Sequence, residues 1–170
     1  PTIGHPDDFV FDVIDEVLTE GVTSRLYSTL VRDKRLAASV LSDTNYPGVR
    51  APNLFVIAAT PLAPHTTAEV ESAIYEELER LKTEPISAKE FERVLNGLDA
   101  DLVRSLRSNS GLASQLAFYQ TVAGTWRYVV NARARIAAVT PADVQRVASQ
   151  YLTKPNRTVG VLVKKAPDKK

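Results

Sequence analysis

The chain has 170 residues, of which 44% are hydrophobic and 24% charged, the mixture of a globular protein that can bury a sizeable core. Lys and Arg number 21 against 20 Asp and Glu, so no excess of positive charge marks a binder of nucleic acid or anionic membranes. Cysteine is absent, which excludes disulfides and thiolate sites, and no apolar run approaches the ~18 residues of a membrane span. Methionine is also absent, even at position 1, so we expect a piece of a longer protein.

The first third of the chain predicts two helices around a sharp turn. Apolar side chains at helical spacing predict a helix over residues 7–20, with a proline and two aspartates at its start. Gly21 can adopt the left-handed conformation that closes this helix. Thr23 and Ser24 can cap the N–H groups of a second helix, which we expect over residues 24–33.

Three strands are expected. Residues 39–43 alternate polar and apolar side chains and residues 54–59 are rich in β-forming types, which predicts an antiparallel hairpin with a long connection. Residues 157–163 read as a third strand. Capping boxes, prolines and glycines predict five intervening helices, from 66 to about 82, from 87 to a break at 108–111, and over 112–122, 126–138 and 140–151.

Many helices and few strands favour an α+β fold with two layers, in which helices pack on one face of a small, mostly antiparallel sheet. We expect a single domain over residues 1–164 of a longer protein, with the sheet one strand short at its N-terminal edge. A disordered tail is expected over residues 165–170.

No catalytic constellation is visible in the residues alone. A zinc site needs two or three converging imidazoles or carboxylates. His5 and His65 are the two histidines, each in a loop before a predicted helix, and neither belongs to an H-x-x-E-H pair. A G-x-S-x-G elbow and a glycine-rich phosphate loop are also absent from the sequence. We therefore expect no catalytic residue and no metal ligand in this chain.

The string Gly-Val-Thr-Ser-Arg-Leu-Tyr at residues 21–27 resembles the segment that opens the C-terminal domain of the pitrilysin/insulinase-like zinc peptidases. That family includes mitochondrial processing peptidase and its bacterial relatives. Residues 86–91, 139–144 and 151–152 follow in the order that this domain has them, so the resemblance covers nearly the whole chain. The motif positions for which we expect structural roles are Gly21, Ser24, Arg25 and Leu26.

In that family two similar α+β domains enclose a peptide chamber, and the first carries the zinc motif. The resemblance implies that this chain is the non-catalytic C-terminal domain of a zinc metallopeptidase, inactive by itself. Zinc would lie in a missing N-terminal domain or a partner subunit, and the partners would be that homologous domain and a peptide substrate. The alternative is a structural or assembly subunit without proteolysis, and an unrelated α+β binding module is a third. We expect a soluble bacterial protein, with cytoplasm and periplasm both open.

One departure from the family pattern concerns polarising groups. Catalytically competent members often place an arginine just after the motif helix and a tyrosine seven residues on. Val31 and Ala38 occupy those positions here and are expected to face the chamber. If the alignment with the family pattern is shifted by one residue, Arg32 takes the arginine position but Ser39 takes the tyrosine position. Neither Val nor Ala donates a side-chain hydrogen bond to an oxyanion. This copy would then shape the chamber, or its partner domain would supply those groups.

Overall fold

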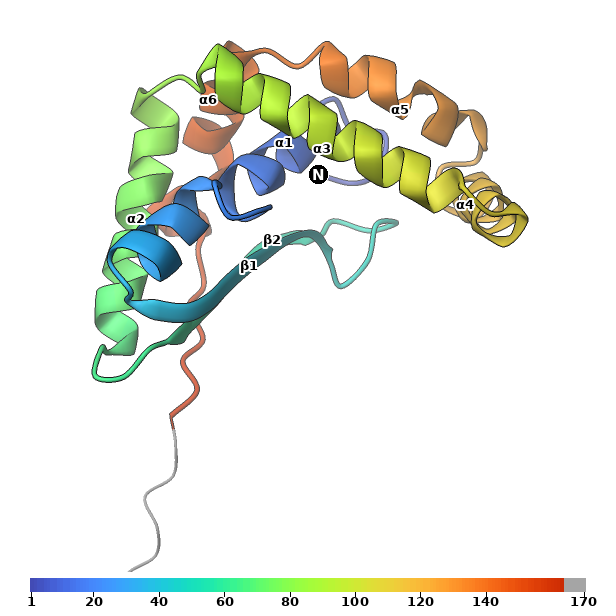
Figure 1. Cartoon of the computed structure of the whole chain (residues 1–170). Coiled ribbons are helices and arrows are strands. Elements are labelled where there is room, and N and C mark those ends of the chain that lie inside the picture. The colour runs from blue at the N-terminus through green and yellow to red at the C-terminus, as the bar shows by residue number, and fades with distance from the viewer. Residues whose placement is uncertain (164–170) are drawn as a thin grey trace, which may run out of the picture.

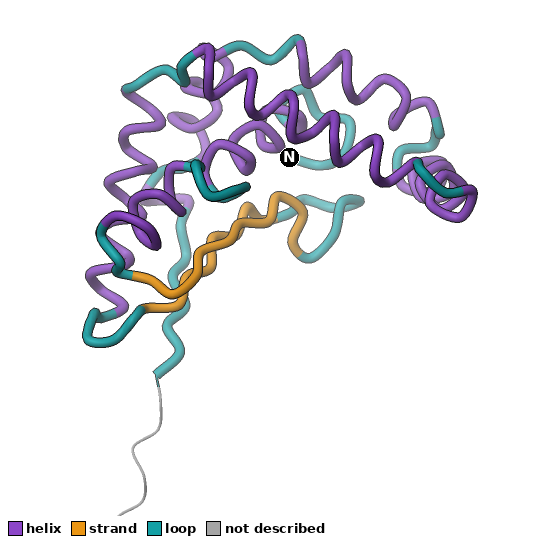
Figure 2. The backbone as a smooth tube through the Cα atoms, viewed as in Figure 1, coloured by secondary structure: helices purple, strands orange, loops and turns teal. Residues whose placement is uncertain are grey.

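The computed structural model of the protein describes residues 1–163, so the predicted tail at 165–170 lies outside the described residues. Helices lie over one side of a two-stranded hairpin, which confirms the predicted α+β architecture (Figures 1 and 2). The elements in chain order are α1 (Asp8–Leu18), η1 (Tyr27–Asp33), β1 (Ala37–Tyr46), β2 (Leu54–Pro61), α2 (Thr67–Thr83), α3 (Ala88–Leu106), α4 (Asn109–Val122), α5 (Arg127–Ala137), α6 (Pro141–Tyr151) and η2 (Lys154–Asn156).

The predicted antiparallel hairpin is confirmed. β1 and β2 pair in a register that sets Val40 opposite Ala59, and residues 47–53 form the long connection. The side chain of Val40 is buried while that of Leu41 is 54% exposed, because successive side chains of a strand point to opposite faces. One face of the hairpin therefore packs on the helices, and among residues 1–163 the other face is largely exposed.

The predicted third strand is wrong for the described residues. Residues 157–163 form no ladder with β1 or β2, and the described sheet has two strands. Arg157 instead lies over the ring of Tyr75 on α2, at 3.6 Å, and Leu162 is 98% exposed. An alternating apolar segment becomes a strand only where a neighbouring backbone supplies hydrogen bonds, and neither hairpin strand supplies them here.

Helix α1 forms the centre of the core. It contacts β1, α3, α5 and α6, and it lies between the hairpin and the outer helices (Figure 1). Each fully buried aliphatic side chain contributes roughly 1.5–3 kcal/mol to stability, so α1 is a main source of it. The buried apolar residues of α1 are Phe9, Val10, Phe11, Val13, Ile14, Val17 and Leu18.

Three helices begin at capping boxes, as their sequence spacing indicates. The side chains of Thr66, Ser87 and Thr140 accept from the backbone three residues on, and the acidic residue there accepts in return. Helix α4 begins earlier than predicted, because the hydroxyl of Ser108 accepts from the N–H of Gly111 at 3.0 Å and so caps the helix. The predicted break at 108–111 is thus the first turn of α4.

Candidate functional site

The motif corner, residues 21–26, forms the turn between α1 and η1. Gly21 has φ +79°, in the left-handed region that glycine occupies without steric cost. Ser24 is fully buried, and its hydroxyl donates to the carbonyl oxygen of Gly21 at 2.8 Å. The prediction that Ser24 caps the next helix is wrong, because no N–H of the described residues donates to its hydroxyl and η1 has no side-chain cap. Leu26 is also fully buried, in the core.

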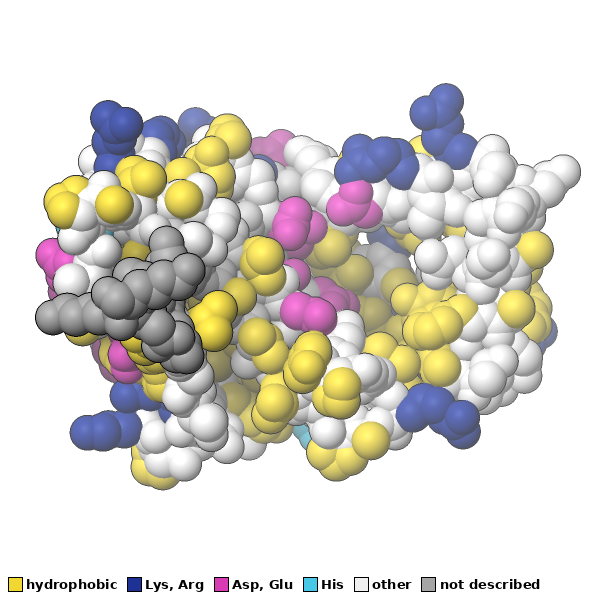
Figure 3. Space-filling view, turned by 90° about the horizontal axis from the view of Figure 1, so that it is seen from below, with side chains coloured by type: hydrophobic (Ala, Val, Ile, Leu, Met, Phe, Trp, Pro, Cys, Tyr) yellow, Lys and Arg dark blue, Asp and Glu magenta, His cyan; other side chains and the backbone are white. Residues whose placement is uncertain are grey.

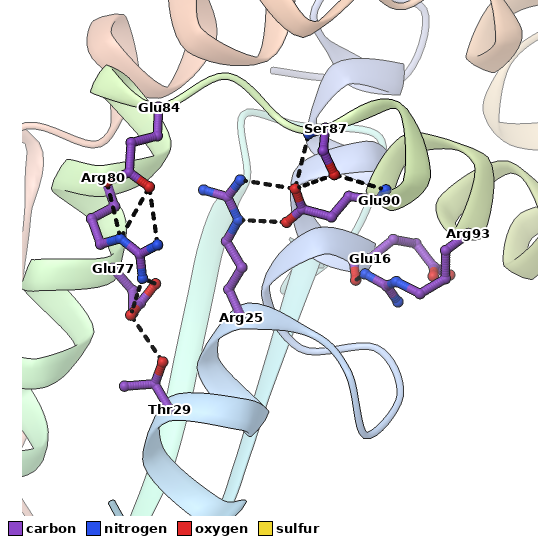
Figure 4. A network of polar contacts seen from close by, with 9 residues as sticks. All are labelled: Glu16, Arg25, Thr29, Glu77, Arg80, Glu84, Ser87, Glu90 and Arg93. Atoms are coloured by element: carbon purple, nitrogen blue, oxygen red, sulfur yellow. Dashed lines mark hydrogen bonds and ion pairs between the residues drawn. The ribbon is translucent and has the colours of Figure 1, made fainter. Parts of the chain in front are cut away.

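Arg25 joins this corner to the start of α3 (Figure 4). Its Nε and Nη2 atoms donate to the two carboxylate oxygens of Glu90, at 2.8 and 3.3 Å. The same carboxylate accepts from the N–H and hydroxyl of Ser87, both at 2.9 Å. Burial alone would raise the pKa of Glu90, but the hydrogen bonds from Arg25 and Ser87 outweigh it and lower the pKa to about 2. The pair is therefore ionised at neutral pH.

A second polar group ties η1 to α2 (Figure 4). Thr29 donates from Oγ1 to the buried carboxylate of Glu77 at 2.9 Å. Arg80 donates to Glu77 at 2.9 Å and to Glu84 at 3.0 Å, so the buried carboxylate has both a neutral and a charged donor. Such pairing is what a buried charge requires. These contacts hold η1 against α2.

The segment predicted as an α-helix over 24–33 is mainly a π-helix, η1. Its wider turn is closed by the N–H of Lys34, which donates to the carbonyl of Thr29 at 3.0 Å. The apolar pattern does not distinguish the two helices, because residues four apart lie on one face in both. Leu30 is fully buried, consistent with either.

The two expected chamber positions differ in environment. Val31, on η1, is half-buried against the core, whereas Ala38 is exposed at an irregularity in the pairing of β1 with β2. Arg32 is exposed, and its Nε lies 2.6 Å from Asp33, so the π-helical turn does not bring it into the core. Arg35 adopts φ +51°, a left-handed conformation that is uncommon for a side chain of its size.

Acidic side chains on α1 are a feature that the sequence interpretation missed. Asp8, Asp12 and Glu16 recur every four residues on a helix whose other residues, apart from Asp15, are apolar, and this spacing was the available signal. Burial, reinforced by neighbouring carboxylates, raises the pKa of Asp12 and of Glu16 to about 7. Asp7 differs, because a hydrogen bond from Arg146 on α6, at 2.7 Å, lowers its pKa.

The histidines lie apart from one another and from any ligand set. The imidazole of His5 is 3.9 Å from Asp7, and that of His65 is 3.5 Å from Glu69. Among residues 1–163, no three His, Asp or Glu side chains gather closely enough to hold a metal ion. The described side chains therefore do not fit zinc. Within the same residues, no helix is both long and apolar enough to cross a membrane.

Comparison with known proteins places these features in a family. Residues 1–98 match the family described as the peptidase M16 inactive domain. Zinc protease PqqE of Helicobacter pylori is 28% identical over 152 residues, and an uncharacterized zinc protease of Streptomyces coelicolor is 30% identical over 155 residues. Each alignment covers 89% of this chain but 33% of the relative, so the chain spans about a third of the length of these relatives.

Solved structures agree with this assignment. A protease from Helicobacter pylori superposes with a TM-score of 0.83 at 26% identity, covering 92% of this chain and 37% of that one. The inactive peptidase domain of a candidate zinc protease from Bordetella parapertussis gives 0.81 at 27% identity, covering 98% of this chain and 90% of that one. The chain therefore belongs to the peptidase M16 family, in which it corresponds to the inactive, non-catalytic domain.

Proposed function

We propose that this chain is the non-catalytic half of a zinc endopeptidase and closes a peptide chamber against a zinc-bearing domain. The observation that carries the proposal is the match of residues 1–98 to the M16 inactive domain. The relatives named zinc proteases are about three times as long as the part that aligns, since the alignments cover 33% of them. Their remaining length has room for a separate zinc-bearing domain.

The arrangement of this chain suits enclosure and peptide binding. Val31 and Ala38 offer no side-chain donor for a developing oxyanion, and two nitrogens of Arg25 are occupied by Glu90. The described hairpin has two strands, so each strand has one edge that no described strand pairs with. An extended peptide can add to such an edge through its backbone, which gives affinity with little sequence preference.

The test uses the purified 170-residue chain alone and together with a homologous zinc-bearing M16 domain. We expect the chain alone to hold no stoichiometric zinc and to cleave no peptide, and the mixture to hydrolyse unstructured peptides. The control is a mixture whose zinc-bearing domain lacks the glutamate of its H-x-x-E-H motif. One tightly held zinc per chain would contradict the proposal. A stable, zinc-loaded complex without hydrolysis would favour the structural or assembly role instead.

A further inference from the structure

A cavity of about 360 Å³ lies between α1, α3, α4 and α5, beside Asn45 and Val49 of the hairpin region. Figure 3, seen from the side of the hairpin that faces away from the helices, shows a recess at which hydrophobic and acidic side chains gather. The volume falls within the roughly 300–1,000 Å³ of small-molecule sites. Its aliphatic wall is formed by Leu95, Leu98, Leu102, Val129 and Ile136.

Four carboxylates line this cavity, and three of them have partners in the chain. Asp8 accepts from the hydroxyl of Tyr128 at 2.6 Å. Asp99 pairs with Arg133 at 2.7 Å, and Asp101 pairs with Arg104. The fourth is Asp12. Among residues 1–163, no side chain or backbone group forms a hydrogen bond or ion pair with the Asp12 carboxylate. Its capacity to accept hydrogen bonds is thus directed at the cavity rather than at the protein.

The charges around Asp12 make it a strong acceptor for a cation. Burial, together with the neighbouring carboxylates of Asp8, Asp15 and Glu16, raises its pKa to about 7. No cationic side chain of the described residues opposes these effects on Asp12. An incoming cation would therefore relieve both the repulsion and the lost hydration of this carboxylate.

Aromatic rings supply the second element of the site. Phe9, Phe118, Tyr119 and Tyr128 line the cavity, and Tyr128 stacks on Phe9 and Tyr119 with centroids 5.3 and 5.1 Å apart. The guanidinium of Arg135 lies 5.6 Å from the Phe9 centroid and 5.8 Å from that of Tyr128. These rings therefore already attract a planar cation in the folded chain.

We propose that the cavity binds a flat organic cation, an amidinium or guanidinium group, through the Asp12 carboxylate and the surrounding aromatic rings. Two parallel N–H groups of such a cation match the two oxygens of a carboxylate. The aliphatic wall of the cavity would contact the apolar part of the ligand to which the amidinium or guanidinium group is attached. A free small molecule and an arginine side chain of a peptide present the same chemistry. The proposal does not depend on the peptidase role.

The probe is benzamidine, with its neutral isostere benzamide as the matched ligand, titrated calorimetrically into the 170-residue chain at pH 8. We expect benzamidine to bind at least roughly tenfold more tightly, the factor that a charge-assisted hydrogen bond contributes. Asp12→Asn should remove this preference. Asp33→Asn is the control, because Asp33 is exposed, does not line the cavity and is not among the carboxylates that act on Asp12. Amide chemical shifts should change at Asp12, Tyr119 and Tyr128.

A second variant tests the location independently of the charge. Ala132→Phe places a ring where a small side chain lines the cavity, so it should weaken benzamidine binding while Asp12 is retained. Equal affinity for benzamidine and benzamide, no binding of either, or an unchanged preference in Asp12→Asn would overturn the proposal. Competition by acetyl-Ala-Arg-Ala-amide, but not by its Gln counterpart, would support the site and identify a peptide arginine as the source. Binding of benzamidine without peptide competition would support a site for a free cation.

Discussion

Arg25 and Glu90 are 65 residues apart in the sequence, yet two hydrogen bonds join the guanidinium of one to the carboxylate of the other. Glu90 is also the acidic member of the capping box that begins α3, where it accepts from Ser87. One carboxylate therefore closes a helix end and fastens the motif corner to that helix. Arg25 is 11% exposed, so this contact is largely shielded from water.

Replacement of Arg25 by alanine should lower the free energy of unfolding by about 2 kcal/mol, because it leaves Glu90 with its cap but without its charged donors. Arg25→Lys should restore only part of the loss, since an ammonium cannot form the two-pronged contact. Urea unfolding measures both. Arg32→Ala removes an exposed pair with Asp33 and should change little. An Arg25 effect no larger than this control would contradict the prediction.

The acidic residues of α1 should make the chain more stable at about pH 5 than at about pH 8. Burial raises the pKa of Asp12 and Glu16 to about 7, above the ~4 of an unfolded chain, so the folded state binds more protons between these values. Their contribution is complete below about pH 4 and is lost as the pH rises through 7. Glu90, with a pKa of about 2, titrates below this window.

Urea unfolding across this pH range measures the effect. The double variant Asp12→Asn, Glu16→Gln should flatten the slope, since both raised pKa values are removed. Asp33→Asn is the control, because that carboxylate is exposed and its pKa is lowered by Arg32. Stability that increases between about pH 5 and 8, or a slope that persists in the double variant, would show that these groups are not the cause.

Arg35→Gly should stabilise the chain by about 0.5–1 kcal/mol. Arg35 is exposed and has φ +51°, a conformation that costs a residue with a β-carbon but not glycine. The greater flexibility of glycine in the unfolded chain reduces the gain without cancelling it. Thermal unfolding measures the change. Arg32→Gly, within η1, should instead lower the melting temperature, and a loss in both variants would argue against strain at position 35.

Val31→Arg combined with Ala38→Tyr should raise the activity of the assembled peptidase, a prediction that rests on the proposed function. The two side chains would add donors where the family places them, and one oxyanion donor contributes roughly 10²–10³ in kcat, so a rise of about tenfold is expected. Peptide hydrolysis by the complex measures it. Val22→Arg, at a 63% exposed position of the motif corner, is the control. Activity equal to that of the unchanged complex would mean that the two positions are misplaced.

Helix ends were predictable because their chemistry is local. Thr66 with Glu69 and Ser87 with Glu90 are three residues apart, so a capping box forms from neighbours in the chain whatever else the fold does. The hairpin was predictable for a similar reason, since period-two alternation shows which face is buried. Ser24 was misinterpreted, because its hydroxyl donates to the carbonyl of Gly21, and which backbone group lies within its reach depends on how the corner folds.

The amino-acid sequence by itself determined where most helices begin, which segments pair as a hairpin, and the family resemblance in residues 21–27. Only the tertiary structure decided that Arg25 meets Glu90, that residues 157–163 stay unpaired by the hairpin, and that Asp12 faces a cavity. The spacing of residue types along a sequence indicates contacts between residues that lie within one or two helical turns of each other. Ion pairs, strand partners and the hydration of a carboxylate depend on which distant segments pack together, and packing is a property of the whole fold.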